Sequence, residues 1–234
     1  RGGTWTQVYS QNSVRTLAID PARPHFVYAG TVNAGVAKST NSGSTWTLVN
    51  SGLGSLEIQT INITRDGGNV VYAGTAAGVY KSSDAGNTWT AINSGLPSGV
   101  VVNSFAVHPS DANILFLGSS LDGLFKSEDR GSSWRSIGTG ISSPQINSIA
   151  INPLNSDFMY VGAGTGGVFR SKDGGSTWSQ IDANGVGPFG VGETGAVLIN
   201  PKNPRIVYAH FNIGSTASKI YKRLEDLSVP ALLG

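Results

Sequence analysis

The sequence predicts an all-β fold built from one repeated unit of four short antiparallel strands. The first observation is composition: the 234 residues include 32 Gly but only 13% charged residues, which suits short strands and tight turns better than long helices. The second is a period, because the five tryptophans recur every 41 to 45 residues. The third is a run of alternating residues before each Gly-rich stretch, as expected for strands with one buried face.

Each internal tryptophan ends an eight-residue phrase of the form S-x-D-x-G-x-T-W, here called the box turn. At the N-terminus only the second half of the phrase is present, as RGGTW. The Asp, or Asn in the first copy, is expected to accept backbone N–H bonds within the turn, and the Gly to supply backbone freedom. We interpret the repeated Asp as structural. The predicted box-turn residues are Asn41, Gly43, Trp46, Asp84, Gly86, Trp89, Asp129, Gly131, Trp134, Asp173, Gly175 and Trp178.

Around each box turn the sequence divides into four strands. An alternating run forms strand a, two strands b and c flank a Gly-rich turn, and strand d begins at the tryptophan. A four-stranded unit of about 44 residues is typical of a β-propeller blade. The predicted blades are 14–50, 58–93, 102–138, 146–182 and 195–223, with 4–9 as the last strand d.

The sequence therefore predicts a five-bladed β-propeller in a single domain, residues 1–225, followed by a tail at 226–234. The last repeat has no strand d of its own, and residues 4–9 have no strand c. Pairing these two segments would close the ring and remove two free sheet edges. Two alternatives stay open: a piece of a larger propeller, and an oligomer in which the closing strand comes from another copy.

The box turns resemble Asp-box, or BNR, repeats of sialidase-like, xyloglucanase-like, sortilin-like and photosystem II assembly-factor-like propellers. This resemblance implies a propeller fold with the boxes on the outer rim, away from any active site. It implies no single activity, since all these families share the motif. The sialidase pattern needs an arginine triad, and no arginine arrives at strand a in three blades. The xyloglucan-active pattern needs a cleft between two seven-bladed domains, which one five-bladed unit cannot form.

A candidate ligand site lies at the channel mouth, where strands a begin. Long polar side chains recur there in successive repeats, and one irregular loop, 183–194, adds an aromatic ring and a carboxylate. Amides both donate and accept hydrogen bonds, and pockets with a few convergent polar groups suit small ligands. The alternative is that these residues only hydrate a water-filled channel. The candidate ligand-binding residues are Arg15, Gln59, Asn103, Asn147, Phe189 and Glu193.

The sequence favours a non-catalytic binding or scaffolding propeller that recognises a glycan or a protein segment at this mouth. One alternative is a glycoside hydrolase-like enzyme, which would need a convergent acid pair. Another is an engineered or reconstructed repeat propeller with no evolved ligand. No catalytic residue is assigned.

Several partners and groups are not expected. A net charge of +2 without a basic block does not indicate nucleic acid, and no apolar run is long enough for a membrane span. The three histidines share no metal-ligand spacing, so neither a metal nor a cofactor is expected. We expect a monomer, with a strand-exchanged oligomer as the alternative, and a bacterial extracellular or periplasmic location rather than a cytoplasmic one.

Overall fold

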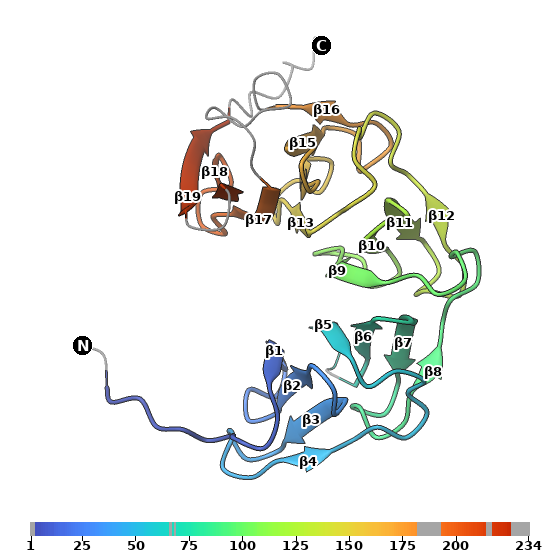
Figure 1. The fold of residues 1–234 in the computed structure, drawn as a ribbon, viewed down its shortest axis with the longest axis vertical. Coiled ribbons are helices and arrows are strands. Elements are labelled where there is room, and N and C mark those ends of the chain that lie inside the picture. The colour runs from blue at the N-terminus through green and yellow to red at the C-terminus, as the bar shows by residue number, and fades with distance from the viewer. Residues whose placement is uncertain (1–2, 66, 68, 182–192, 214–216, 226–234) are drawn as a thin grey trace.

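The computed structural model describes residues 3–65, 67, 69–181, 193–213 and 217–225. Throughout these residues the regular elements are β-strands, arranged in five antiparallel sheets. Figure 1 shows the sheets following one another around an open arc, with the first strand of each sheet innermost. The predicted all-β architecture of antiparallel sheets is therefore confirmed.

The first four sheets repeat one plan, in which four strands pair in chain order. In each, the fourth strand has only two paired residues, shorter than the six predicted for strand d. The sheets are β1 (Val14–Ile19), β2 (Val27–Thr31), β3 (Val36–Ser39) and β4 (Thr47–Leu48); β5 (Ile58–Ile63), β6 (Val71–Thr75), β7 (Gly78–Ser82) and β8 (Thr90–Ala91); β9 (Val102–Val107), β10 (Leu115–Ser119), β11 (Leu124–Ser127) and β12 (Arg135–Ser136); and β13 (Ser148–Ile151), β14 (Met159–Gly162), β15 (Val168–Ser171) and β16 (Ser179–Gln180).

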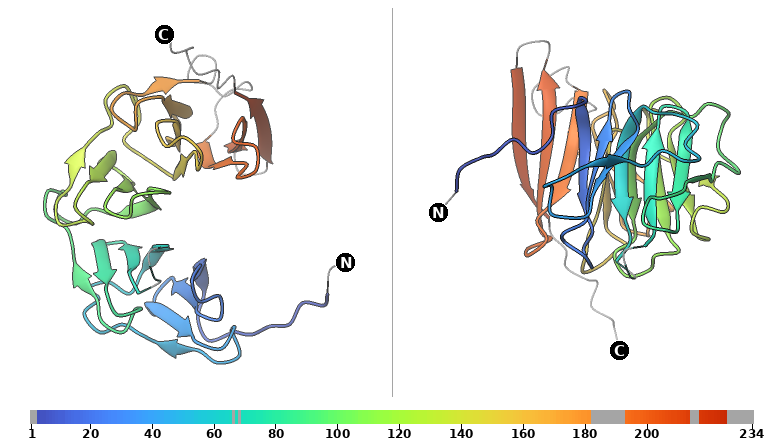
Figure 2. Two further views of the ribbon diagram at one scale, coloured as in Figure 1. Left: turned by 180° about the vertical axis from the view of Figure 1, so that it is seen from behind. Right: turned by 90° about the horizontal axis from the view of Figure 1, so that it is seen from below.

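The fifth sheet differs from the others because it has three strands, β17 (Glu193–Ile199), β18 (Ile206–Ile213) and β19 (Ala217–Leu224). The expected pairing of residues 4–9 with this sheet is not present in the structure. Those residues form no strand, and they extend from the opposite end of the arc (Figures 1 and 2). The open arc keeps the two segments apart. The predicted tail, 226–234, lies outside the described residues.

Apolar side chains pack between neighbouring sheets and hold the arc together. One cluster joins Tyr72 and Val79 of the second sheet to Val102 and Phe105 of the third. A glycine makes this approach possible: a Cβ added at Gly74 would lie 2.5 Å from the Cγ1 of Val102. The other complete sheets also have a glycine at this position of strand b: Gly30 on β2, Gly118 on β10 and Gly162 on β14. The repeated Gly of strand b is therefore a packing requirement, since it lets the next inner strand come close.

The box turns are closed by side-chain hydrogen bonds, as in the copy at 82–89. The Oγ of Ser82 accepts the N–H of Gly86 at 2.7 Å, and Asp84 accepts the N–H and the hydroxyl of Thr88 at 2.9 and 2.7 Å. Ala85 and Gly86 have φ of 59° and 85°, a left-handed conformation that the turn requires. In the first copy, Asn41 replaces the acid and still accepts the Thr45 N–H at 2.8 Å.

The box tryptophans join each sheet to the one before it. The indole N–H of Trp89 donates to the carbonyl of Val49 at 2.8 Å, and Trp134 donates in the same way to Ile92 at 2.8 Å. Trp178 donates to Ile137 at 3.1 Å. The repeat predicts a buried ring for each of Trp46, Trp89, Trp134 and Trp178, and this is confirmed for the last three.

The first and last members of the tryptophan series behave differently. Trp46 is only half-buried, and its indole N–H donates within its own turn, to the Gly43 carbonyl at 3.0 Å. Its ring packs against Tyr9, with centroids 5.4 Å apart. Trp5 is fully exposed. A tryptophan of this repeat is therefore buried only where a complete sheet precedes it.

We expect Trp89→Ala to destabilise the fold by about 3–5 kcal/mol, because it removes a buried aromatic ring and its bond to the preceding sheet. Trp46→Ala should cost clearly less, because that ring is half-buried and makes no such bond. Urea melts of both variants followed by circular dichroism measure the difference. Equal losses would show that the contact between sheets is not what stabilises the box tryptophan.

The box turn also predicts a pH dependence of stability. Hydrogen bonds from the Thr88 hydroxyl and N–H and from Ser82 lower the pKa of Asp84 from 3.8 to about 2. A depressed folded-state pKa contributes stability above the unfolded pKa, and that contribution is lost as the pH falls from about 4 to 2. Asp84→Asn should flatten this part of the stability–pH curve, with Asn41 as the natural precedent in the chain. An unchanged slope in acid titration of the variant would contradict this role of Asp84.

Candidate functional site

The inner strands β5, β9, β13 and β17 lie side by side around the inside of the arc, so their first residues meet at one end. This end is the predicted channel mouth. The box turns lie at the other end, because each one bonds to the turn between strands a and b. The N–H of Ala85 donates to the Asn69 carbonyl and that of Arg130 to the Asn113 carbonyl, at 2.8 and 3.0 Å.

Three of the predicted mouth residues are brought together at β9, β13 and β17. The Nδ2 of Asn103 donates to the Oδ1 of Asn147 at 3.3 Å. The Nδ2 of Asn147 donates to the Oε1 of Glu193 at 3.2 Å and to the Thr194 carbonyl at 2.8 Å. Asn103, Asn147 and Glu193 thus form a hydrogen-bonded chain across three neighbouring inner strands, here called the amide chain.

Two further residues belong to the amide chain and were not predicted from the sequence. The Nε2 of Gln145 donates to Asn147 Oδ1 at 3.2 Å and also to Glu193 Oε1. The hydroxyl of Ser120, on the turn after β10, donates to Asn103 Oδ1 at 2.7 Å. Gln145 had a signal in the sequence, since it lies two residues before Asn147 and a strand repeats its face every second residue. Ser120 had none, because it comes from another strand's loop.

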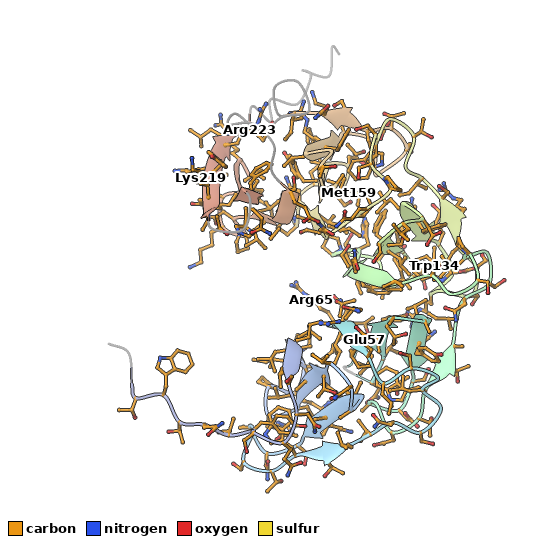
Figure 3. The ribbon with its side chains drawn as sticks, viewed as in Figure 1. Glu57, Arg65, Trp134, Met159, Lys219 and Arg223 are labelled. Atoms are coloured by element: carbon orange, nitrogen blue, oxygen red, sulfur yellow. The ribbon has the colours of Figure 1, made fainter. Side chains whose placement is uncertain are left out.

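The two remaining mouth residues, Arg15 and Gln59, meet at a second cluster. Arg15 Nη1 donates to the carbonyl oxygen of the Gln59 amide and forms an ion pair of 3.1 Å with Glu57. Figure 3 labels Glu57, which directly precedes β5. Gln59 Nε2 donates to Glu57 at 3.1 Å. Both charged side chains are more than a third exposed, so the pair adds little stability. Arg15, Glu57 and Gln59 are here called the arginine cluster.

The loop prediction for 183–194 needs correction at its end. Glu193 and Thr194 begin strand β17 instead of lying on a loop, because their backbone pairs with Asn212 and Phe211 of β18. Phe189, the proposed aromatic platform, lies outside the described residues.

In the fifth repeat, Gly195 stands at the position that Arg15, Gln59, Asn103 and Asn147 hold in the first four repeats. A Cβ added there would lie 2.6 Å from the Nδ1 of His210. His210 stands on strand b where the four earlier sheets have the glycine that admits the next inner strand. Gly195 therefore makes room for the His210 ring. In the first four sheets the glycine is on strand b and the larger side chain on strand a, whereas in the fifth sheet the glycine is on strand a and the larger side chain on strand b.

A cavity of about 640 Å³ lies at the opposite end of the inner strands and was not predicted as a site. Arg65 and His108 contribute to its lining, beside apolar residues such as Val107 and Ile149. His108 already has a structural partner, since its Nδ1 accepts the N–H of Asp111 at 3.1 Å, and burial lowers its pKa. Ser110 and Asp111, in the same turn, also line the cavity. At the equivalent turns of the first and fourth sheets, outside the cavity lining, Asp20 and Asn152 likewise accept backbone N–H groups. The polar groups here are therefore mainly turn residues.

The described residues hold no cluster of three or more His, Asp or Glu side chains suited to a metal ion. They also include no helix that is long and apolar enough to cross a membrane. What the mouth offers is hydrogen bonding: amide donors and acceptors, two carboxylates and one guanidinium. Each of the two carboxylates, Glu57 and Glu193, already accepts from neighbouring side chains.

No protein-family model matches the chain, and no curated protein sequence is significantly similar to it. Solved structures are similar in fold. An ancestral GH74 enzyme superposes with a TM-score of 0.79 at 21% identity, over 95% of this chain and 31% of its own. The GH74 xyloglucanase from Xanthomonas campestris gives 0.65 at 17% identity, over 92% and 44%. An extracellular domain from B. thetaiotaomicron gives 0.71 at 16% identity, over 92% and 27%.

These similarities confirm the predicted resemblance in fold to xyloglucanase-like propellers. The chain spans less than half the length of each of these structures. At such identities the likeness concerns the fold alone.

Proposed function

We propose that the chain is a non-catalytic, five-bladed binding propeller whose channel mouth recognises a glycan. The observation that carries the proposal is the amide chain, in which Asn103, Asn147 and Glu193 are linked across three inner strands. A site assembled from separate repeats is what a ligand lying across the channel requires. Similarity to an extracellular domain supports an extracellular or periplasmic location.

The chemistry of the mouth suits a polyhydroxylated ligand. Sugar hydroxyls both donate and accept, and the amides of Gln145 and Asn147 offer both functions beside the Glu193 carboxylate. The hydrogen bonds within the amide chain hold these side chains in place before a ligand arrives, which lowers the entropy cost of binding. The arginine cluster adds a guanidinium for a carboxylate-bearing sugar. An acidic protein segment is the second ligand class that this cluster would accept.

The mouth is favoured over the cavity at the opposite end of the inner strands for a physical reason. Polar groups at the cavity end, such as His108 and Asn152, bond the backbone of their own turns. Polar groups at the mouth bond one another across different sheets. Only the second arrangement leaves side chains that a ligand can engage without opening a turn.

A glycan array followed by titration calorimetry tests the proposal. With the ligand that the array identifies, the Asn103→Ala/Asn147→Ala double variant should bind about tenfold or more weakly, about 1.4 kcal/mol. The matched control is Asn62→Ala, which removes an amide further along inner strand β5. Asp84→Ala, in a box turn, should lower stability and leave the affinity of the folded protein unchanged. An effect of Asn62 or Asp84 equal to that of the pair would contradict a mouth site.

Catalysis is the competing function, and one screen separates the two. Hydrolysis of any glycoside that is abolished by Glu193→Gln would identify an enzyme and overturn the non-catalytic assignment. Binding without turnover, weakened by the mouth variants, supports it. A folded protein that binds nothing on the array would favour a repeat propeller without an evolved ligand.

A further inference from the structure

The two ends of the arc expose apolar side chains that the interior of the arc buries. On β1 the side chain of Leu17 is 66% exposed, whereas its equivalents Ile61, Phe105 and Val197 are 5%, 7% and 1% exposed. Each of those three is covered by the preceding sheet. The first sheet therefore has the face that receives a preceding sheet, but nothing covers that face among the described residues.

At the other end of the arc, the outer edge of β19 has no strand paired to it among the described residues. Ile220 is 76% exposed, although the residues at the same register, Val36, Val79 and Leu124, are 0% exposed. In each complete sheet the carbonyl of this residue accepts an N–H from the outer strand, for example Val49 to Val36 at 2.8 Å. The edge of β19 lacks such a strand. Unpaired edges of this length and polarity are liabilities that proteins normally cover.

We propose that residues 4–9 of the same chain pair with β19 as its missing outer strand and close five blades into a ring. Their sequence, TWTQVY, matches the outer-strand sequences TWTLVN and TWTAIN. The other sheets set the register, since Lys38 pairs with Thr47 and Lys81 with Thr90. The same register pairs Lys222 with Thr6, Tyr221 with Gln7, and the Val8 N–H with the Ile220 carbonyl.

The N-terminal segment already contacts the first sheet as an outer strand of a preceding blade would. A Cβ added at Gly43 would lie 3.5 Å from the Cγ2 of Val8. The equivalent glycine, Gly175, has the Cδ1 of Ile137 at 3.1 Å, and Ile137 belongs to the preceding outer strand. Tyr9 packs on Trp46 beside it. Residues 8 and 9 therefore already pack against the first sheet as an outer strand would. Closure brings β19 to them and forms the junction between the first and fifth sheets, here called the seam.

A buried hydroxyl on the fourth sheet lacks the partner that closure supplies. Tyr28 and Tyr72 each donate from strand b to a backbone carbonyl in the box turn of the next sheet: Tyr28 to Ala85 at 2.9 Å, and Tyr72 to Arg130 at 3.4 Å. Tyr160 stands at the same register and is fully buried, but its hydroxyl has no partner in the described part of the chain. Burial raises the pKa of Tyr160 to about 12, so the hydroxyl stays protonated and needs an acceptor.

The acceptor for Tyr160 is the box turn that the fifth repeat lacks. In register, Arg223 stands at the position of Ser171, which opens the preceding box turn, and RGGTW at residues 1–5 supplies the second half of the phrase. At present Arg223 Nη1 donates to the Ile181 carbonyl at 2.9 Å, the position that box tryptophans take in the other sheets. Closure places Trp5 next to this carbonyl and exchanges one donor for the other.

A single chain favours closure within itself. Among the described residues one sheet lacks an outer strand, and one segment with an outer-strand sequence, 4–9, belongs to no sheet; both are parts of the same molecule. Pairing within one chain is intramolecular, so its rate does not fall as the protein is diluted. Closure requires small changes of angle at the contacts between sheets, so that the two ends of the arc meet. It buries Leu17 and Ile220 against each other's sheets. The histidine at position 210 makes this seam different in detail from the other four.

Disulfide trapping tests the pairing, because the chain contains no cysteine. In Thr6→Cys/Lys222→Cys, paired residues of an antiparallel ladder lie within the Cα separation that a disulfide tolerates. We expect an intramolecular disulfide in the monomer, formed about tenfold or more faster than in the matched control Thr6→Cys/Ser218→Cys. The control cysteine lies four residues along the same strand, about 13 Å away. Adding Trp5→Ala should slow trapping in the first pair.

Mass spectrometry and non-reducing gels over a range of protein concentrations read the outcome, with circular dichroism in reductant to establish that each variant is folded. Disulfide-linked dimers would overturn closure within one chain and indicate strand exchange between copies. Equal rates for the two pairs, or no disulfide in a folded protein, would overturn the pairing itself. The inference rests on the same five-bladed ring as the proposed function, but it is tested without ligand, so either can fail alone.

Discussion

The contact between one sheet and the next is the constraint on which the rest of this structure depends. A box tryptophan donates its indole N–H to a carbonyl of the preceding outer strand, and a glycine on strand b admits the next inner strand. In the described part of the chain, the apolar clusters combine side chains from two neighbouring sheets. Each sheet is therefore completed by its neighbours, as in other repeat folds.

The same contacts determine where a ligand site can arise. Because neighbouring sheets repeat one spacing, equivalent residues of strands a lie at the same height along the inside of the arc. Side chains such as Asn103 and Asn147, 44 positions apart, come within hydrogen-bond distance. The box turns lie at the opposite end, where their acids bond the turn backbone. The box turns and the polar residues of the mouth therefore lie at opposite ends of the strands.

The fifth sheet is where the repeat departs from its own pattern. It lacks an outer strand, carries His210 in place of the strand b glycine, and holds Arg223 where the other repeats have the box serine. Glu225 is buried between Arg170 and Arg223. This ion-paired carboxylate occupies the end of the repeat, near the unpartnered Tyr160 hydroxyl whose pKa it helps to raise. All these departures lie in or beside the fifth sheet, at the end of the arc where β19 lacks an outer strand.

The sequence by itself determined the all-β class, the four-stranded repeat, the box turns and the set of polar residues at the start of each strand a, because these depend on local patterns. A phrase such as SSDAGNTW specifies its own turn, and residues two apart share a strand face. Sequence did not reveal Ser120 in the amide chain, because that contact joins a loop of one strand to the start of another. The curvature of the arc, which leaves β19 without an outer strand, was decided only by tertiary structure. The physical reason is that curvature sums small angles at every contact between sheets, and no local pattern specifies those angles.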